Sequence, residues 1–261
     1  MIGIFDSGLG GLTVVREVMA RLPGYDLIYF GDTARTPYGP KSPETVIRYA
    51  VQIAEWLLDN GAQSIVVACN TASSVATEAL RQKFGVPIFE VVSPAARLVI
   101  QNPSIRSVGI IGTRATINSG IYEKMIKAER PEVKIYSREC PLLVPLVEEG
   151  WLKKPETKQI VKKYLYPLKL KQIDTLILGC THYPILKDII KAKIGKRVRI
   201  IDSSQTIAAA IKQFLDDHPE SKENLGRHSK HRLCVSDITE QFKEIAQDIL
   251  SVPVKLEHIR L

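Results

Sequence analysis

The sequence lacks a hydrophobic stretch long enough to cross a membrane. No segment reaches the roughly 18 consecutive apolar residues that indicate a transmembrane helix. The first residues, MIGIFDSG, contain no basic segment followed by an extended apolar region, so they do not have the pattern of a secretory signal peptide. We therefore expect a cytoplasmic protein that makes no contact with a membrane.

Cysteine is also scarce, and its spacing argues against two common uses. The four cysteines lie far apart and form neither a CxxC motif nor a Cys/His cluster; they are Cys69, Cys140, Cys180 and Cys234. Without a secretion signal, such cysteines are expected to be reduced thiols rather than a disulfide framework. The sequence therefore predicts free thiols and no metal site.

Acidic residues are in the minority, with 28 Asp and Glu against 36 Lys and Arg, which gives a net charge of +8. Such an excess could suit an anionic partner, either nucleic acid or a carboxylate substrate. However, the lysines concentrate in residues 153–171 and 187–196, where a solvated face of an amphipathic helix is the ordinary interpretation. No aromatic residues are interleaved with the basic ones in the manner of a nucleic-acid site. We therefore do not expect nucleic acid as a required partner.

What the chain does contain is a regular alternation of short β-branched runs and helix-length amphipathic segments. This alternation predicts an α/β fold in which helices flank parallel sheets. The predicted strands are residues 2–5, 27–30, 65–68, 88–92, 108–111, 133–136, 175–178, 198–201 and 232–235.

One helix is marked clearly at both ends. Ser42 can cap a helix whose first residue is Pro43, and Gly61 follows the end of that helix at Asn60. Later in the chain, the polar residues 218–230 are the best candidate for a linker, and a second helix is predicted over residues 238–250.

Three segments recur in the same order in the two halves of the chain. They are GIFDSG (3–8) with GIIGTR (109–114), IVVACNT (65–71) with LILGCTH (176–182), and IFEVVS (88–93) with IIDSSQ (200–205). The members of these pairs lie 106, 111 and 112 residues apart, so the spacing is nearly constant. A repeat of this kind predicts two similar lobes.

We expect one lobe to comprise residues 1–94 and 206–261, and the other residues 95–205, with a pseudo-twofold axis between them. Ligands of open α/β sheets bind beyond the carboxyl ends of the strands, and every repeated motif lies at such an end. If the lobes face each other, Cys69 and Cys180 can approach one small ligand from opposite sides. The sequence therefore predicts an active site between the lobes.

The two cysteine motifs, ACNTAS (68–73) and GCTHYP (179–184), place a thiol between an apolar strand and the expected start of a helix. A helix N-terminus lowers the pKa of a thiol from its usual value near 8.5, because the helix dipole and the free N–H groups favour the thiolate. Cys69 and Cys180 are thus candidate catalytic thiols, whereas Cys140 and Cys234 are expected to be small buried core residues. His182 could hold or relay a proton for a neighbouring thiol, although a structural histidine is nearly as good an interpretation.

Other polar motifs allow both functional and structural interpretations. The segment IFDSGLGG (4–11) resembles a dinucleotide-binding loop, but it does not fit GxGxxG because Thr13 stands where the third glycine is needed. Asp6 and Ser7 could instead bind a substrate at the end of a strand, or Asp6 could simply cap a helix. The segment GDTARTPYGPKSPE (31–44) is expected to be a stiff turn.

Taken together, FDSGLGGLTV, GDTARTPYGPKS, ACNTAS, PLVEEG and LGCTHYP resemble the motifs of glutamate racemases of the aspartate/glutamate racemase superfamily, from Gly3 to about Ser203. The resemblance implies that Cys69 and Cys180 are the acid/base residues, with Asp6 assisting Cys69, and His182 and Glu148 on the side of Cys180. It further implies a substrate-binding set of Asp6, Ser7, Tyr38, Gly39, Asn70, Thr71, Thr113, Thr116, Thr181 and His182. It also implies a cofactor-independent isomerase that makes D-glutamate for peptidoglycan synthesis, and hence for the cell wall and cell shape.

Several alternatives stay open. A pyridoxal-dependent racemase would need a Schiff-base lysine with phosphate and pyridinium partners, and no such set can be assigned. A racemase for aspartate would share the two-thiol logic. A two-lobed protein that only binds a ligand or nucleic acid would have no turnover. We expect a homodimer whose small-molecule partner is glutamate.

Overall fold

Two parallel sheets form the frame of the molecule. In the computed structural model, which describes residues 1–261, six strands form one sheet in the order β10-β9-β2-β1-β3-β4, and four form the other in the order β6-β5-β7-β8. All strand pairs are parallel. The strands are β1 (Ile2–Asp6), β2 (Leu27–Gly31), β3 (Ser64–Val67), β4 (Ile88–Glu90), β5 (Ser107–Gly112), β6 (Lys134–Glu139), β7 (Thr175–Gly179), β8 (Arg199–Asp202), β9 (His231–Val235) and β10 (Leu256–His258).

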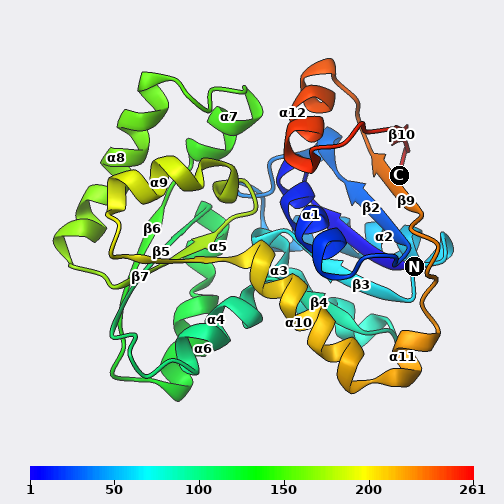
Figure 1. The fold of residues 1–261 in the computed structure, drawn as a ribbon, viewed down its shortest axis with the longest axis horizontal. Coiled ribbons are helices and arrows are strands. Elements are labelled where there is room, and N and C mark those ends of the chain that lie inside the picture. Colours follow the sequence, from blue (N-terminus) through cyan, green and yellow to red (C-terminus); the bar gives the residue numbers. More distant parts are fainter.

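Helices flank both sheets, and the two lobes lie side by side (Figure 1). The α-helices are α1 (Leu12–Arg21), α2 (Pro43–Asp59), α3 (Asn70–Lys83), α4 (Val92–Ile100), α5 (Arg114–Ser119), α6 (Ile121–Glu129), α7 (Leu143–Glu148), α8 (Pro155–Leu170), α9 (Lys187–Ile194), α10 (Ser203–Asp217), α11 (Pro219–Glu223) and α12 (Glu240–Leu250). Short 3-10 helices are η1 (Leu9–Gly11), η2 (Thr33–Arg35) and η3 (Tyr183–Leu186). No helix combines the length and the hydrophobicity that a membrane span requires.

The two sheets share one topology, which explains the repeated sequence segments. The order β2-β1-β3-β4 in the first lobe corresponds to β6-β5-β7-β8 in the second. The repeated segments fall on β1 and β5, on β3 and β7, and on β4 and β8, which are equivalent positions in this order. The prediction of an α/β fold with two similar lobes is confirmed.

Local chemistry explains why the predicted elements form. The residues of β1 are all buried, because helices cover both of its faces: Ile2 and Ile4 belong to one core cluster and Phe5 to another. The N-terminus of α2 is as expected, since Ser42 Oγ accepts a hydrogen bond from Thr45 N at 3.3 Å and Pro43 is the first helical residue.

A continuous apolar core joins the lobes. The largest cluster of buried hydrophobic residues includes Ile2 and Val14 from the first lobe and Leu176 and Ile190 from the second. Two separate clusters lie on the other faces of the sheets, one under α2 and α3 and one under α4 and α6. Because the shared core spans both lobes, their relative position is fixed by packing as well as by the connecting chain.

The chain crosses between the lobes twice, at α4 and at α10. It leaves the six-stranded sheet after β4 and returns after β8, and α10 then packs against α1. We propose that the lobe boundaries lie near residues 94 and 205, which assigns β1–β4, β9 and β10 to the first lobe. The C-terminal segment packs on the six-stranded sheet: β9 pairs with β2, β10 pairs with β9, and α12 packs against α1.

The predicted linker, residues 218–230, is more structured than its composition indicates. It contains the short helix α11, and its last residues are held by Asp26. Asp26 Oδ1 accepts hydrogen bonds from the backbone N–H groups of His228 and Lys230, both at 2.9 Å. The hydrogen bond with the His228 side chain, followed by the Lys230 N–H, holds the pKa of Asp26 below its usual range. The segment is therefore a fixed connection to β9 rather than a free linker.

Candidate active site

Four strands end at the seam between the lobes. The residues at or just beyond their carboxyl ends are Asp6 after β1, Cys69 after β3, Thr113 after β5 and Cys180 after β7. Hydrogen bonds across the seam join these ends: Thr181 Oγ1 donates to Asp6 Oδ1 at 3.3 Å, and the hydroxyl oxygens of Thr71 and Thr113 lie 2.8 Å apart. The predicted candidates from the two halves of the chain therefore meet in one region.

Cys69 occupies the N-cap position of α3, as the sequence predicts, but its thiol is not acidified. Its side chain is buried and its Sγ lies 3.8 Å from Ser7 Oγ. Burial raises the pKa of Cys69, the negative charge of Asp6 raises it further, and together they bring it to about 12 despite hydrogen bonds with Ala72 N–H and Ser7. The expectation of a lowered pKa was wrong for this thiol, because loss of hydration outweighs the helix N-terminus.

Asp6 is fully buried and serves as an acceptor for its own turn. Its Oδ2 accepts hydrogen bonds from Gly8 N at 3.0 Å and Gly11 N at 2.9 Å. Burial raises the pKa of Asp6, while the charge of His182 and the hydrogen bonds oppose that change. Asp6 thus organises the turn that follows β1, and it also lies close enough to influence the charges of Cys69 and His182.

Cys180 is the first member of a hydrogen-bonded chain of three side chains. Its Sγ lies 3.8 Å from His182 Nδ1, and His182 Nε2 lies 3.1 Å from Glu148 Oε1. Burial opposes the charged imidazole, but the hydrogen bonds and charges of Cys180 and Glu148 outweigh it and raise the pKa of His182 to about 10. His182 is therefore a buried cation at neutral pH, held between a thiol and a carboxylate.

The helix expected after Cys180 does not begin there. Residues 181 and 182 form a turn, the short 3-10 helix η3 follows, and α9 starts only at Lys187. Pro184 has no backbone N–H, so it suits only the first turn of a helix, and here that turn is the 3-10 helix η3. The partner of Cys180 is thus His182 rather than a helix dipole.

Three hydroxyl groups form a cluster on the opposite side of the seam. Thr71 Oγ1 lies 2.8 Å from Thr113 Oγ1 and 3.4 Å from Thr116 Oγ1, and the last two are 3.0 Å apart. Thr113 also caps α5 by accepting a hydrogen bond from Thr116 N. Each hydroxyl can donate or accept, so this cluster can exchange its internal hydrogen bonds for bonds to a carboxylate.

Asn70 is buried next to Cys69 and bridges the lobes. Its Oδ1 accepts from Tyr122 OH at 2.7 Å, and its Nδ2 donates to Ser203 Oγ at 3.4 Å. Both partners come from elements beyond β4. The side chain is thus oriented by the second lobe, so that little freedom remains for it to adjust.

Tyr38 and Gly39 lie at the edge of the site, but the Tyr38 side chain faces away. Its hydroxyl donates a hydrogen bond to Asp32, which is buried and also accepts from Arg35 and Ser236. Asp32 was not among the predicted site residues, although an acid directly after the apolar β2 is a signal for it. Its hydrogen bonds hold the 32–39 loop in place, so the backbone rather than the Tyr38 hydroxyl is available to a ligand.

Two cavities lie beside the site residues, and neither cysteine lines them. One of about 450 Å³ lies on the side of Gly39 and Thr71, and one of about 210 Å³ lies on the side of Gly8 and Glu148. No three His, Cys, Asp or Glu side chains cluster so as to hold a metal ion. The site residues are therefore buried at the seam, with one cavity on each of two sides.

The closest approach of the lobes at the site requires glycine at position 10. A Cβ atom there would lie 2.3 Å from Thr181 Oγ1 and 2.5 Å from His182 Nδ1. We expect Gly10→Ala to push the Thr181–His182 turn away and to destabilise the protein by about 1–3 kcal/mol. Chemical denaturation measures this change. Gly85→Ala is the matched control, because a Cβ at Gly85 meets no atom within 4 Å; equal stability of the two variants would contradict the proposed clash.

The fold and the site define a two-lobed α/β isomerase of the racemase class, with one thiol supplied by each lobe. The chain belongs to the Asp/Glu/Hydantoin racemase family, whose model matches residues 12–211. The prediction of membership in this superfamily is confirmed.

Individual relatives support this assignment. A glutamate racemase from Geobacter metallireducens is 45% identical over 249 residues, which is 95% of this chain and 92% of the relative. A glutamate racemase structure from Bacillus anthracis superposes with a TM-score of 0.93 at 36% identity, covering 100% of this chain and 97% of that one. A Francisella tularensis glutamate racemase in complex with D-glutamate gives a TM-score of 0.90 at 37% identity, covering 99% and 96%.

Proposed function

We propose that this protein interconverts L-glutamate and D-glutamate without a cofactor, using Cys69 and Cys180 as its two acid/base groups. The observation that carries the proposal is the placement of these thiols. They follow equivalent strands, β3 and β7, in opposite lobes, and both are buried at the seam. Two groups on opposite sides of a substrate are what inversion of a carbon centre requires, because the proton must leave from one face and arrive at the other.

The reaction is a proton relay across Cα. One cysteine, as thiolate, takes the Cα proton and becomes a thiol, while the pair of electrons left on Cα gives a flattened, enolate-like carbanion. The other cysteine, as thiol, donates its proton to the opposite face and becomes the thiolate. Each turnover leaves the two protonation states exchanged, and equilibration with solvent protons restores them.

The two thiols differ in their electrostatic surroundings, which favours one resting form. His182 is a cation beside Cys180, whereas the carboxylate of Asp6 lies near Cys69 and the pKa of Cys69 is raised to about 12. A thiolate is therefore stabilised at Cys180 and disfavoured at Cys69. We propose that the enzyme rests with Cys180 as thiolate and Cys69 as thiol, the form that accepts the enantiomer whose Cα–H faces Cys180.

The surrounding polar groups supply what a dicarboxylic amino acid needs. The substrate-binding set is proposed to be Asp6, Ser7, Tyr38, Gly39, Asn70, Thr71, Thr113, Thr116, Thr181 and His182. The hydroxyl, amide and backbone N–H groups of this set can bind the two carboxylates, and those near the α-carboxylate stabilise the charge that develops on deprotonation. Closed lobes exclude water, which strengthens these interactions.

The wider role follows from the product. D-Glutamate supplied in this way would serve peptidoglycan synthesis in the cytoplasm and so contribute to the cell wall and cell shape. The expected homodimer remains a prediction, and sedimentation velocity on the purified protein checks it directly.

An assay by circular dichroism tests the proposed function. We expect purified protein, without added cofactor, to remove the optical signal of L-glutamate and to act much more slowly on L-aspartate. A greater rate on L-aspartate would move the assignment to aspartate. An absence of turnover on both substrates would favour a non-catalytic binding protein.

A further inference from the structure

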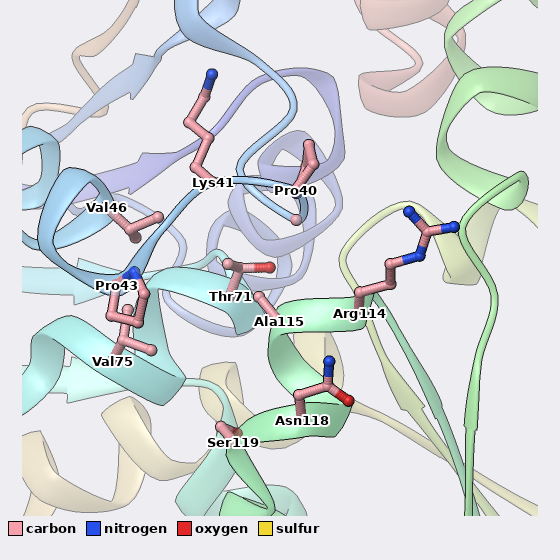
Figure 2. Close-up of a pocket in the computed structure, with 11 residues that line it drawn as sticks. Pro40, Lys41, Pro43, Val46, Thr71, Val75, Arg114, Ala115, Asn118 and Ser119 are labelled. Atoms are coloured by element: carbon pink, nitrogen blue, oxygen red, sulfur yellow. The ribbon is translucent and has the colours of Figure 1, made fainter.

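The larger of the two cavities beside the site residues lies between the lobes, and its charged lining residues are all positive (Figure 2). Its volume is about 450 Å³. The lining comes from the 39–46 segment and α3 in the first lobe and from α5 in the second. Lys41 and Arg114 are its only charged lining residues, and no acid is present.

The two cations are available to bind a ligand. Lys41 is half-buried, and its ammonium group forms no ion pair or hydrogen bond. Arg114 makes one loose contact, with Nε 3.7 Å from Glu139 Oε2, and its side chain is 61% exposed. Such an exposed contact contributes little, so the guanidinium can bind a carboxylate instead.

The cavity borders the candidate substrate site. Thr71, a member of the hydroxyl cluster, lines it, as does Gly39. Arg114 directly follows Thr113, the second member of the cluster, and Figure 2 shows Arg114 and Ala115 together on α5. A ligand that moves from this cavity toward the thiols would first meet the hydroxyl cluster.

The smaller cavity on the opposite side has the reverse charge. Its lining includes the acids Glu148, Glu149 and Asp237, and it contains no Lys or Arg. A substrate with two carboxylates and one ammonium group carries a net charge of −1. Such a substrate is attracted to the first cavity and repelled by the second.

We propose that the cavity lined by Lys41 and Arg114 is the access route to the active site, and that these two residues capture the dicarboxylate substrate before the lobes position it. This inference rests on the proposed function. One cation comes from each lobe, so the route carries positive charge on both of its walls. Lys41 and Arg114 are therefore positioning residues that select for acidic amino acids and do not take part in proton transfer.

The test compares steady-state kinetics of Lys41→Ala/Arg114→Ala with those of the unaltered protein at low and high ionic strength. We expect kcat/KM for L-glutamate to fall about tenfold at low ionic strength, the lower part of the range for electrostatic guidance, with kcat nearly unchanged. The difference in kcat/KM between the two proteins should shrink at high ionic strength, because salt screens Lys41 and Arg114 in the unaltered protein. Arg114→Lys should keep most of the kcat/KM that Arg114→Ala loses, because lysine keeps the positive charge. A purely structural role for arginine would not allow this recovery.

Two controls make the test specific. Lys162→Ala/Arg197→Ala removes the same charge from exposed positions that line neither cavity and should leave kcat/KM unchanged. Asp237→Lys should also have little effect, since that residue lines the acidic cavity.

The outcomes separate the access route from the function itself. Three results would overturn the proposed route: an unaltered kcat/KM in the double variant, an equal loss of kcat/KM in the charge-matched control, or a several-fold rise of kcat/KM in Asp237→Lys. None of them would affect the assignment of racemisation to the unaltered protein. Failure of the unaltered protein to racemise either acidic amino acid would remove both proposals together.

Discussion

Replacing either Cys69 or Cys180 with alanine is expected to reduce racemisation by about 10³- to 10⁴-fold in both directions, because a positioned acid or base supplies up to that factor. If only one thiol were needed, one of the two variants would keep most of the activity. In the two-thiol mechanism, proton transfer at each face of Cα needs the cysteine on that face, so both variants lose activity. Initial rates from L-glutamate and from D-glutamate, measured for both variants, provide the comparison.

Cys234→Ala is the matched control for these variants. Cys234 is also buried, but it lies in β9 with its thiol 3.9 Å from Glu257 and away from the seam. We expect this variant to keep its kcat within a small factor. Circular dichroism in the far ultraviolet should show the same fold for all three proteins. Substantial turnover by a well-folded Cys69→Ala protein would remove that residue from the mechanism.

His182→Asn is expected to have the second largest effect, a fall of about 100-fold in kcat/KM near pH 7. In the unaltered protein the pKa of His182 is raised to about 10, so the imidazolium favours thiolate at Cys180 throughout the neutral range. Asparagine keeps a hydrogen-bonding group but supplies no charge. Without the cation, nothing beside Cys180 favours the thiolate, so the activity of this variant should rise as the pH increases above neutral.

The pH profile of kcat/KM therefore distinguishes the electrostatic role of His182 from a structural one. The deficit of His182→Asn should be greatest below pH 7 and should narrow above pH 9. A deficit of constant size across this range would indicate that His182 only supports the turn. Glu148→Gln should show the same trend with a smaller deficit, since Glu148 acts on Cys180 through His182.

The same residue gives a signed prediction for stability. The pKa of His182 in the folded protein, about 10, lies above its usual value of 6.5. The stabilisation that arises from its protonation is therefore fully present below pH 6.5 and is lost as the pH rises through 10. Equilibrium unfolding should show the unaltered protein losing stability relative to His182→Asn over this interval.

The sequence predicts most of the fold because local and long-range signals agree in it. Short β-branched runs specify nine of the strands, and the repeated segments on β1 and β5 and on β3 and β7 predict two lobes with the same topology. β10 was not predicted. Its three residues, Leu256–His258, show no alternation and form a strand only because β9 offers an edge for pairing.

The site was less predictable, because its chemistry depends on distances between the lobes. The position of Cys69 at a helix N-terminus could be deduced, but its raised pKa depends on burial and on Asp6, which lies 63 positions earlier. The relay from Cys180 through His182 to Glu148 joins the turn after β7 to the end of α7, and no local pattern pairs these two places. Lys41 and Arg114 were missed for the same reason, since their shared cavity exists only when the lobes face each other.

The central claim, proton transfer by two separate groups, is tested most directly by the position of isotope after brief reaction in deuterated water. Starting from L-glutamate with protium at Cα, the account predicts that the first D-glutamate formed carries deuterium at Cα while the recovered L-glutamate still carries protium. This follows because the group that removes the proton does not deliver the new one. D-Glutamate that retains the original protium, or deuterium that enters the L-glutamate as fast as the product forms, would contradict the two-thiol mechanism.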